Sequence, residues 1–320
     1  MLMLAGVVMA ASAAQPPAPA PVSLAAKLEA GQVLRYDLKA ALEVGPPGGS
    51  SDRLEQNARL RMTVATVEDD GSAVVRGAFE TLAATWKPAG GEEATFEWKE
   101  GQELPEEAPP VARLYGALAA ATLELAVGPD GTLRAATGQE KAAAAGREAG
   151  VTDPERVLGV FGPGALATNL GPVFSLDPEA RPRKPGDTWK ATLKAPGLGA
   201  AARSTTVERT LRAHEGGAAV IEAKITEAWQ PRSGRPDLSE PTATPSDQRG
   251  RATEKWDTRA GRLASRVMES SATWTLQLQT SPPMQSVRTF KARVELSRVE
   301  GPAAPAAPPQ SPEPRTPPAP

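Results

Sequence analysis

The side chains best suited to acid–base or metal chemistry are few in this sequence and lie far apart. The single histidine, His214, is in a His-Glu-Gly-Gly turn, and cysteine is absent. A catalytic histidine needs an orienting partner and a concave site, whereas a histidine in a turn is usually a surface residue. With one histidine and no thiolate, a zinc or copper site would consist of carboxylates alone, which is unusual. We therefore expect no metal site and no cofactor.

Carboxylate pairs and acidic turns offer a second kind of chemistry, and their surroundings argue against it. Glu92-Glu93 and Glu106-Glu107 lie in loops rich in proline and glycine, whereas glycoside hydrolysis needs carboxylates at a fixed separation on rigid elements. Asp69-Asp70-Gly71 begins like a calcium loop but lacks the later ligands, and a hairpin turn explains it. Neither a nucleophile elbow nor a phosphate-binding glycine loop occurs. The sequence predicts no catalytic residues and therefore no enzyme.

Composition limits the class of partner. The 320 residues carry a formal net charge of -2, whereas a nucleic-acid-binding domain is normally basic, so we expect no nucleic-acid partner. Hydrophobic residues make up 40% of the chain and aromatic residues only 4%, so aliphatic side chains must fill most of the core. Six tryptophans lie within or at the ends of predicted strands. Two interpretations of them stay open, packing at the edge of the core or forming the rim of an apolar cavity.

Both ends of the chain have the composition of segments outside a folded domain. Residues 1–14 form a short apolar run that ends in small residues, which is typical of a cleaved signal peptide, although no Lys or Arg precedes it. The alternative is a buried N-terminal strand or helix. Residues 15–26 are a predicted proline–alanine linker, and residues 301–320 a predicted proline-rich disordered tail. We expect a soluble exported protein, periplasmic or extracellular, without stable membrane insertion.

Alternation of apolar and polar residues with a period of two dominates the chain from residue 28 onward. It is clearest in residues 34–42, 60–64, 221–226, 274–279 and 290–296. One apolar face and one polar face are typical of antiparallel strands. Turn sequences containing glycine separate these segments. The sequence therefore predicts a mainly β protein.

The order of these segments repeats along the chain. Gly31 to Tyr36 opens one half, and Gly186 to Ala191 opens a second half about 155 residues later. We predict two similar β halves, residues 27–137 and 179–300, joined in one large curved antiparallel sheet that resembles half a barrel. Residues 138–178 between them predict a helical connector, with Asp153 as an N-cap before Pro154. Its apolar side should cover the concave face of the sheet.

Gly186-Asp187-Thr188-Trp189 resembles a motif in a family of uncharacterised exported bacterial proteins, known only as a domain of unknown function. The opening Gly-x-x-Leu-x-Tyr strand at residues 31–36 and the Asp-x-x-x-Gly-Arg-Leu turn at residues 257–263 are similar too. The resemblance covers roughly residues 27–300 and implies no activity. It implies a fold similar to that of periplasmic lipoprotein carriers, in which a helix covers a concave apolar sheet. Members usually carry a signal peptide or a lipoprotein signal, and the missing lipid-bearing cysteine favours a soluble form here.

Two functions remain open after these exclusions. The leading one is binding of an apolar ligand, a lipid or a lipidated protein, in the curved sheet. The residues expected to line the cavity or its lid are Leu158, Phe161, Leu170, Phe174, Trp189 and Trp274. The alternative is a structural or interaction protein of the cell envelope whose concave face is filled by its own side chains. An apolar cavity on the order of 300–1,000 Å³ would distinguish the two; the oligomeric state is left open.

Overall fold

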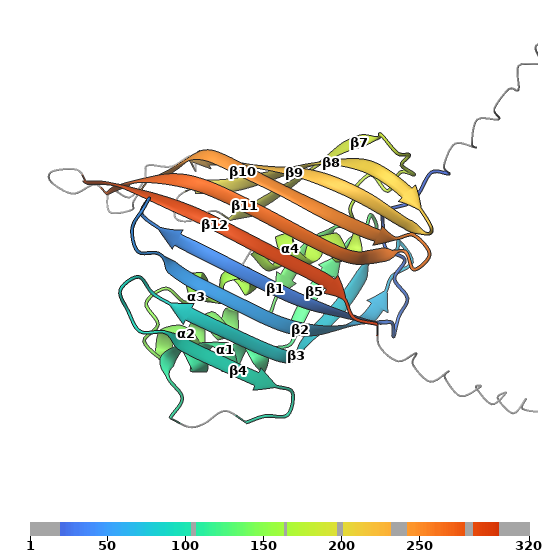
Figure 1. Ribbon diagram of the computed structural model, residues 1–320. Helices are drawn as coiled ribbons and strands as arrows, with labels where there is room; N and C mark the ends of the chain where they lie inside the picture. The colour runs from blue at the N-terminus through green and yellow to red at the C-terminus, as the bar shows by residue number, and fades with distance from the viewer. Residues whose placement is uncertain are drawn as a thin grey trace, which may run out of the picture.

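Twelve strands form one antiparallel sheet in the computed structural model (Figure 1), which confirms the predicted fold class. The described residues are 20–103, 107–162, 165–196, 201–231, 242–278 and 284–300, and side chains are described outside residues 193–203, 228–247 and 276–284. The predicted signal peptide, the start of the predicted linker and the predicted tail lie outside the described residues.

The first and last strands in the chain, β1 and β12, lie side by side at the centre of the sheet and join its two halves. The order across the sheet is β6-β5-β3-β2-β1-β12-β11-β10-β9-β8-β7, and β4 also pairs with β3. Because β1 pairs with β12 from Tyr36 to Gly45, the halves share one continuous sheet, as expected. The strands are β1 Val33–Gly45, β2 Asp52–Val67, β3 Ala73–Lys87, β4 Ala94–Lys99, β5 Leu123–Val127, β6 Leu133–Thr137, β7 Thr188–Pro196, β8 Ala201–Glu215, β9 Ala218–Pro231, β10 Thr242–Asp257, β11 Arg262–Leu278 and β12 Met284–Arg298.

Each half is a meander, and the two halves cross the sheet in the same direction. From β1 the chain runs outward to β6, and from β7 it runs inward to β12. The third strand of each half differs in its next partner along the chain. In the first half two short strands, β4 and β5, pair with different stretches of β3. In the second half one long strand, β10, pairs with β9. This arrangement fits the predicted repeat, but an internal duplication stays a prediction.

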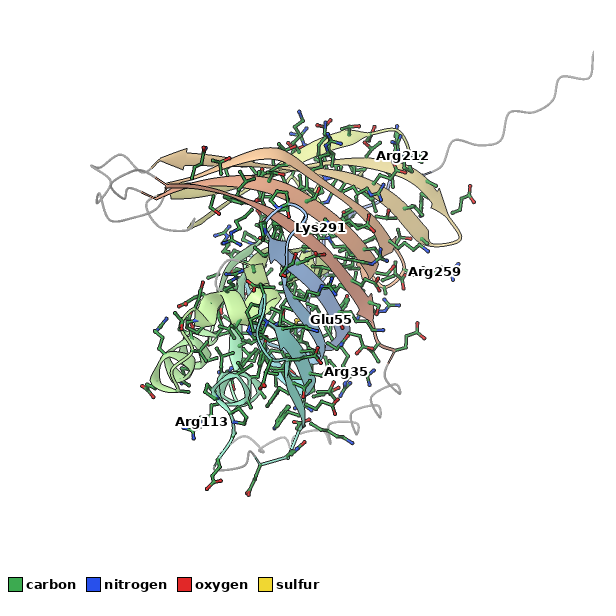
Figure 2. All side chains as sticks on the ribbon, turned by 60° about the vertical axis from the view of Figure 1, so that its left-hand side comes forward. Arg35, Glu55, Arg113, Arg212, Arg259 and Lys291 are labelled. Atoms are coloured by element: carbon green, nitrogen blue, oxygen red, sulfur yellow. The ribbon has the colours of Figure 1, made fainter. Side chains whose placement is uncertain are left out.

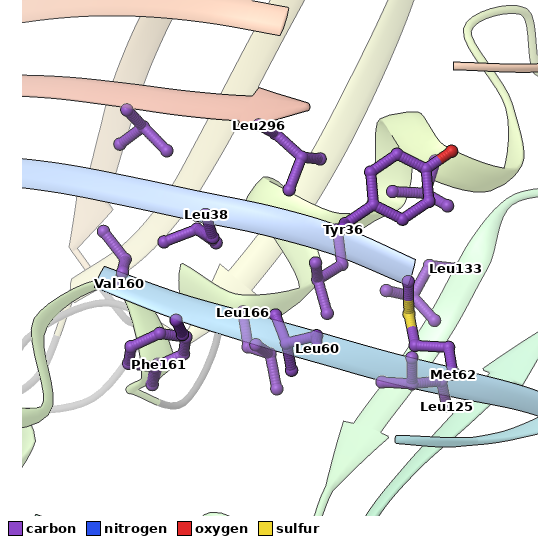
Figure 3. Close-up of a cluster of buried hydrophobic side chains, with 14 of the residues drawn as sticks. Tyr36, Leu38, Leu60, Met62, Leu125, Leu133, Val160, Phe161, Leu166 and Leu296 are labelled. Carbon is purple, nitrogen blue, oxygen red and sulfur yellow. The ribbon is translucent and has the colours of Figure 1, made fainter. Parts of the chain in front are cut away.

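The alternation of side chains along the strands produces the core. Leu34, Tyr36 and Leu38 of β1 point to the concave face and are at most 3% exposed. The strand register places Leu38 between Leu296 of β12 and Ala58 of β2. Figure 3 shows Tyr36, Leu38 and Leu296 gathered with Val160, Phe161 and Leu166 of the connector. A fully buried leucine stabilises the fold by about 1.5–3 kcal/mol, so this layer is the main source of stability.

Helices lie on the concave side of the sheet, and most of them belong to the connector. They are α1 Pro110–Ala119, α2 Glu140–Glu148, α3 Pro154–Leu158, the 3-10 turn η1 Gly159–Phe161 and α4 Ala165–Phe174. The Asp153 side chain accepts a hydrogen bond from the Arg156 backbone N–H, which confirms the predicted cap. Figure 1 shows α1, α2 and α3 grouped near β3 and β4, while α4 lies nearer the middle of the sheet and contacts β6 and β11.

Two segments differ from the sequence-based expectation. Helix α1 lies inside the predicted first β half, because its apolar residues Leu114, Tyr115 and Leu118 have helical spacing and are buried against the sheet. Residues 22–26 are packed, not a free linker, since Val22 and Leu24 are buried and backbone bridges join Val22 to Arg183 and Ala25 to Ser175.

The Asp69-Asp70-Gly71 segment forms the turn between β2 and β3, as predicted. The Asp70 carboxylate accepts hydrogen bonds from the backbone N–H and the hydroxyl of Ser72, at 2.8 and 2.6 Å. Gly71 has φ +86°, a conformation that side-chain-bearing residues rarely adopt. The acidic pair therefore serves turn geometry.

Candidate functional site

The six residues expected to line a cavity or lid occupy two different environments. Leu158, Phe161, Leu170 and Phe174 are fully buried between the connector and the sheet, and the ring of Phe161 packs edge-on against Phe79 at 5.3 Å between centroids. Trp189 is 5% exposed and its indole N–H donates to the Leu176 carbonyl. Trp274 on β11 is half-buried. Five of the six are therefore buried in the core, and Trp274 lies on a more accessible surface.

A neutral polar cluster fastens the connector to the first half. The Gln56 amide donates to the Tyr115 hydroxyl at 2.9 Å and to the Leu158 carbonyl at 2.8 Å. Its carbonyl oxygen accepts from the Val160 backbone N–H at 3.0 Å, and the Tyr115 hydroxyl donates to the Val157 carbonyl. Every donor of the Gln56 amide is used, which is how buried polar groups are normally accommodated. Burial raises the pKa of Tyr115, so this hydroxyl stays a neutral donor.

A charged cluster of three side chains is buried under the second half. Arg209 of β8 donates two hydrogen bonds to Glu254 of β10, at 2.7 and 3.2 Å. The Nε of Arg266 of β11 lies 3.2 Å from Oε1 of the same carboxylate. The three side chains are 6%, 0% and 3% exposed. We call these residues the buried triad; it carries two positive charges and one negative charge.

Electrostatics keep this triad ionised. Burial by itself would raise the pKa of Glu254, but the two neighbouring guanidinium groups outweigh burial and hold the pKa below its usual value. Burial lowers the pKa of Arg266, and repulsion from Arg209 acts in the same direction. Arginine remains protonated in proteins, so the triad retains an excess positive charge away from water.

Beyond the triad, the concave face of the second half is lined by small and aromatic side chains. Along β11, Ser270, Ala272 and Trp274 face the same side, and the register sets Ser270 opposite Ala292 and Ala272 opposite Phe290 on β12. Gly250 of β10 pairs with Ser270. We call these six residues the concave strip. Ala272 and Ala292 are each 8% exposed, and the other four are half-buried.

The opposite, outer face holds a charged groove of about 730 Å³ across β1, β2, β10, β11 and β12. Its lining includes Glu55 and Lys291, both labelled in Figure 2, together with Arg53 and Arg249. Glu269 in the groove pairs with Arg251 and Arg293, both at exposed positions. None of the six predicted cavity residues lines this groove or the second outer hollow, of about 500 Å³ near Trp98.

The other side chains with potential chemistry are at the surface of the described structure. His214 lies at a hairpin end, with its Nε2 3.3 Å from the Thr258 hydroxyl. Glu92, Glu93 and Glu107 are exposed. Within the described ranges, no three His, Asp or Glu side chains are grouped so that they could hold a metal ion.

The connector includes an apolar stretch whose length and composition alone would allow it to cross a membrane. This stretch runs from Pro154 to Phe174, over two residues outside the described ranges. Most of it is buried against the sheet, and a core helix of a soluble protein meets the same criterion.

No protein-family model and no curated protein matches the sequence. Among solved structures, the chain is similar to one titled "Lipid-protein interactions in lipovitellin", with a TM-score of 0.43, 12% identity and 87% of this chain covered. The chain spans only 26% of that protein's length. It also aligns with OccK7 (OpdD) of Pseudomonas aeruginosa, with a TM-score of 0.22, 8% identity, and coverage of 83% of this chain and 98% of that one. Both scores are low, and neither similarity assigns a function or a site.

Sequence reasoning missed the buried triad, although the pattern contained a signal for it. Arg209 stands between Val207 and Leu211, in a position where alternation calls for an apolar side chain. Glu254 likewise stands between Ala252 and Trp256. A charged residue at an inward position of a strand must find a buried partner, so these positions predict an internal ion pair.

Proposed function

We propose that this chain is an exported, non-enzymatic protein that binds an apolar ligand, a lipid or a lipidated group, on the concave strip. The observation that supports this proposal is the difference between the halves. The first half is closed by fully buried connector side chains, whereas Ser270, Trp274 and Phe290 of the second half remain half-buried. Small side chains beside two aromatic rings offer an apolar surface for an acyl chain.

The connector supplies a lid in this proposal. Helix α4 presents Leu166, Leu170 and Val173 to the core and contacts β11. Pro172 lies inside it, and proline removes one backbone hydrogen bond from a helix. Because Leu158 and Phe161 are core residues, charged substitutions there would unfold the protein and could not distinguish a lid from a core.

The test is native mass spectrometry with lipid extraction on the full chain, purified from a bacterial host that exports it. Two single variants at neighbouring positions of β11 are compared. Ser270→Phe fills the concave strip, whereas Ser271→Phe adds the same ring to the exposed outer face. We expect near-stoichiometric lipid on the wild type and on Ser271→Phe, and a loss of at least about tenfold on Ser270→Phe.

Two results would overturn the proposal. One is a wild-type protein that is free of lipid after purification and stays so when vesicles of bacterial phospholipid are added. The other is equal lipid content in the two variants, because the ligand would then lie elsewhere.

The alternative function is an interaction protein of the cell envelope, and the outer groove favours it. Among the described residues, Arg53, Arg249 and Lys291 line this groove without an ion-pair partner. Exposed positive charge attracts acidic partners in a salt-dependent way. Binding of poly-glutamate at low salt that is lost in Lys291→Glu, together with a lipid-free wild type, would establish this alternative in place of lipid binding.

A further inference from the structure

The buried triad contains a cation that the protein leaves without adequate partners. Arg209 and Glu254 form a two-bond pair, which is the strongest arrangement available to a guanidinium and a carboxylate. The Nε of Arg266 lies 3.2 Å from Glu254 but has no hydrogen-bond partner with acceptable geometry. Its Nη1 reaches the Thr168 carbonyl only at 3.4 Å, and its Nη2 faces the Met268 sulfur at 3.3 Å. A thioether is a weak acceptor.

This arrangement is unfavourable for a side chain that serves only the core. Buried charges are normally paired and fully hydrogen-bonded, because their removal from water is costly. The excess positive charge of the triad is compensated when a second anion reaches Arg266. A planar guanidinium binds a carboxylate or a phosphate with two parallel hydrogen bonds.

Arg266 stands at one end of the concave strip. Along β11, Arg266, Met268, Ser270, Ala272 and Trp274 alternate onto the same face. With about 3.4 Å per residue, Arg266 and Trp274 are separated by about 27 Å. This separation suits an extended long-chain amphiphile with its head at one end and its tail along the strip.

We propose that Arg266 binds the anionic head group of an amphiphile, a carboxylate or a phosphate monoester, whose acyl chain lies along the concave strip towards Trp274. The inference rests on the proposed function and deepens it. The backbone carbonyl of Thr168 in α4 is the neighbour that the head group replaces, so binding also loosens the contact between α4 and β11. The Trp256 indole N–H, two residues from Glu254 on β10, is also buried without a partner.

The experiment compares amphiphiles of one chain length that differ only in the head group. The probes are a long-chain fatty acid, the matching alcohol and the matching alkyl phosphate, and affinities are measured by displacement of a fluorescent fatty acid from the full chain. We expect the acid and the phosphate to bind at least about tenfold more tightly than the alcohol. Comparison of acid with phosphate identifies which head group is preferred.

Variants assign the discrimination to Arg266. In Arg266→Met, affinity for the acid should fall at least about tenfold while affinity for the alcohol is unchanged. Arg266→Lys retains the charge without the planar fork, so we expect an intermediate loss; it also serves as the informative variant should Arg266→Met fold poorly. Arg251→Met, at a position 83% exposed on the outer face, is the matched control and should bind like the wild type.

The failures of the two proposals are distinguishable. If no amphiphile binds the wild type, the proposed function is wrong. If acid and alcohol bind equally well and Arg266→Met and Arg266→Lys bind both as the wild type does, the strip binds apolar chains but the head-group inference is overturned.

Discussion

Under the first half of the sheet, Gln56 connects three backbone and side-chain partners through neutral hydrogen bonds, and the surrounding apolar side chains are fully buried. Under the second half, Glu254 is shared by Arg209 and Arg266, and the adjoining strip is half-buried. The two regions share strand alternation and sheet continuity. They differ in charge and in how completely their polar groups are satisfied. The polar groups around Gln56 already have their hydrogen bonds, so a ligand would contribute none there. In the second half the buried Nε of Arg266 lacks a hydrogen-bond partner, and a ligand can supply one.

The largest expected effect is that of Glu254→Gln, which removes the only negative charge of the triad. Two buried guanidinium groups would then lack a counterion, which typically costs about 3–5 kcal/mol. Chemical denaturation of the wild type and the variant measures the difference in the free energy of unfolding. Glu222→Gln is the matched control, because Glu222 pairs with Arg212 at an exposed position and should change stability by less than about 1 kcal/mol. Equal losses in both variants would mean that the triad is not buried.

Gln56→Leu should have the next largest effect and should act on the first half. Leucine fills a similar volume with an apolar side chain but leaves the Leu158 carbonyl and the Val160 N–H unpaired. Each unsatisfied group costs about 1–3 kcal/mol. Hydrogen exchange should become faster in α3 and η1, while β10 and β11 remain protected. Uniformly faster exchange over both halves would contradict the separation of the two regions.

The effect of pH sharpens the same comparison through Glu254. The folded-state pKa of Glu254 lies below its usual value of 4.5, so its charge stabilises the fold above that pH, and this contribution is lost as pH falls through the folded pKa. The stability difference between wild type and Glu254→Gln should therefore be full near neutral pH and shrink in acid. Denaturation curves at a series of pH values check this. A difference that stays constant in acid would show that Glu254 does not act through its charge.

The smallest effect is expected for Arg266→Met in the absence of ligand. The change leaves the neutral pair Arg209–Glu254 intact, and replacing a poorly paired buried charge with an apolar side chain is often neutral or stabilising. We expect a change in the free energy of unfolding of less than about 1 kcal/mol, measured by thermal and chemical denaturation. A loss as large as that of Glu254→Gln would mean that Arg266 is a necessary part of the core.

The sequence was most informative where one physical rule acts alone. Alternation in β1 and β12 predicts both strands, because one face of each meets the core and the other meets water. The connector was predictable from Asp153-Pro154 and the apolar residues that follow. Helix α1 was missed although Leu114, Tyr115 and Leu118 have helical spacing, because the segment is short and lies between strands.

The candidate site was harder to predict because it depends on pairing across the sheet. Arg209, Glu254 and Arg266 come from three strands, and only the register brings them together. The apolar connector residues, in contrast, were interpreted as a ligand cavity because a side chain that lines a cavity and one that fills a core look alike in sequence. Which half of the concave face is closed depends on where the connector packs, which is a tertiary property. Export and the absence of catalysis stay predictions.

The most direct test of the central claim is to locate the ligand by photo-crosslinking. The full chain is incubated with a long-chain fatty acid that carries a diazirine in its tail, irradiated, and digested for mapping by mass spectrometry. We predict adducts at the inward positions of β11 and β12, such as Ala272, Trp274 and Phe290, with competition by unlabelled fatty acid. Adducts at outward positions such as Ser271, or on the buried first half near Gln56, would contradict the assignment of binding to the second half of the concave face.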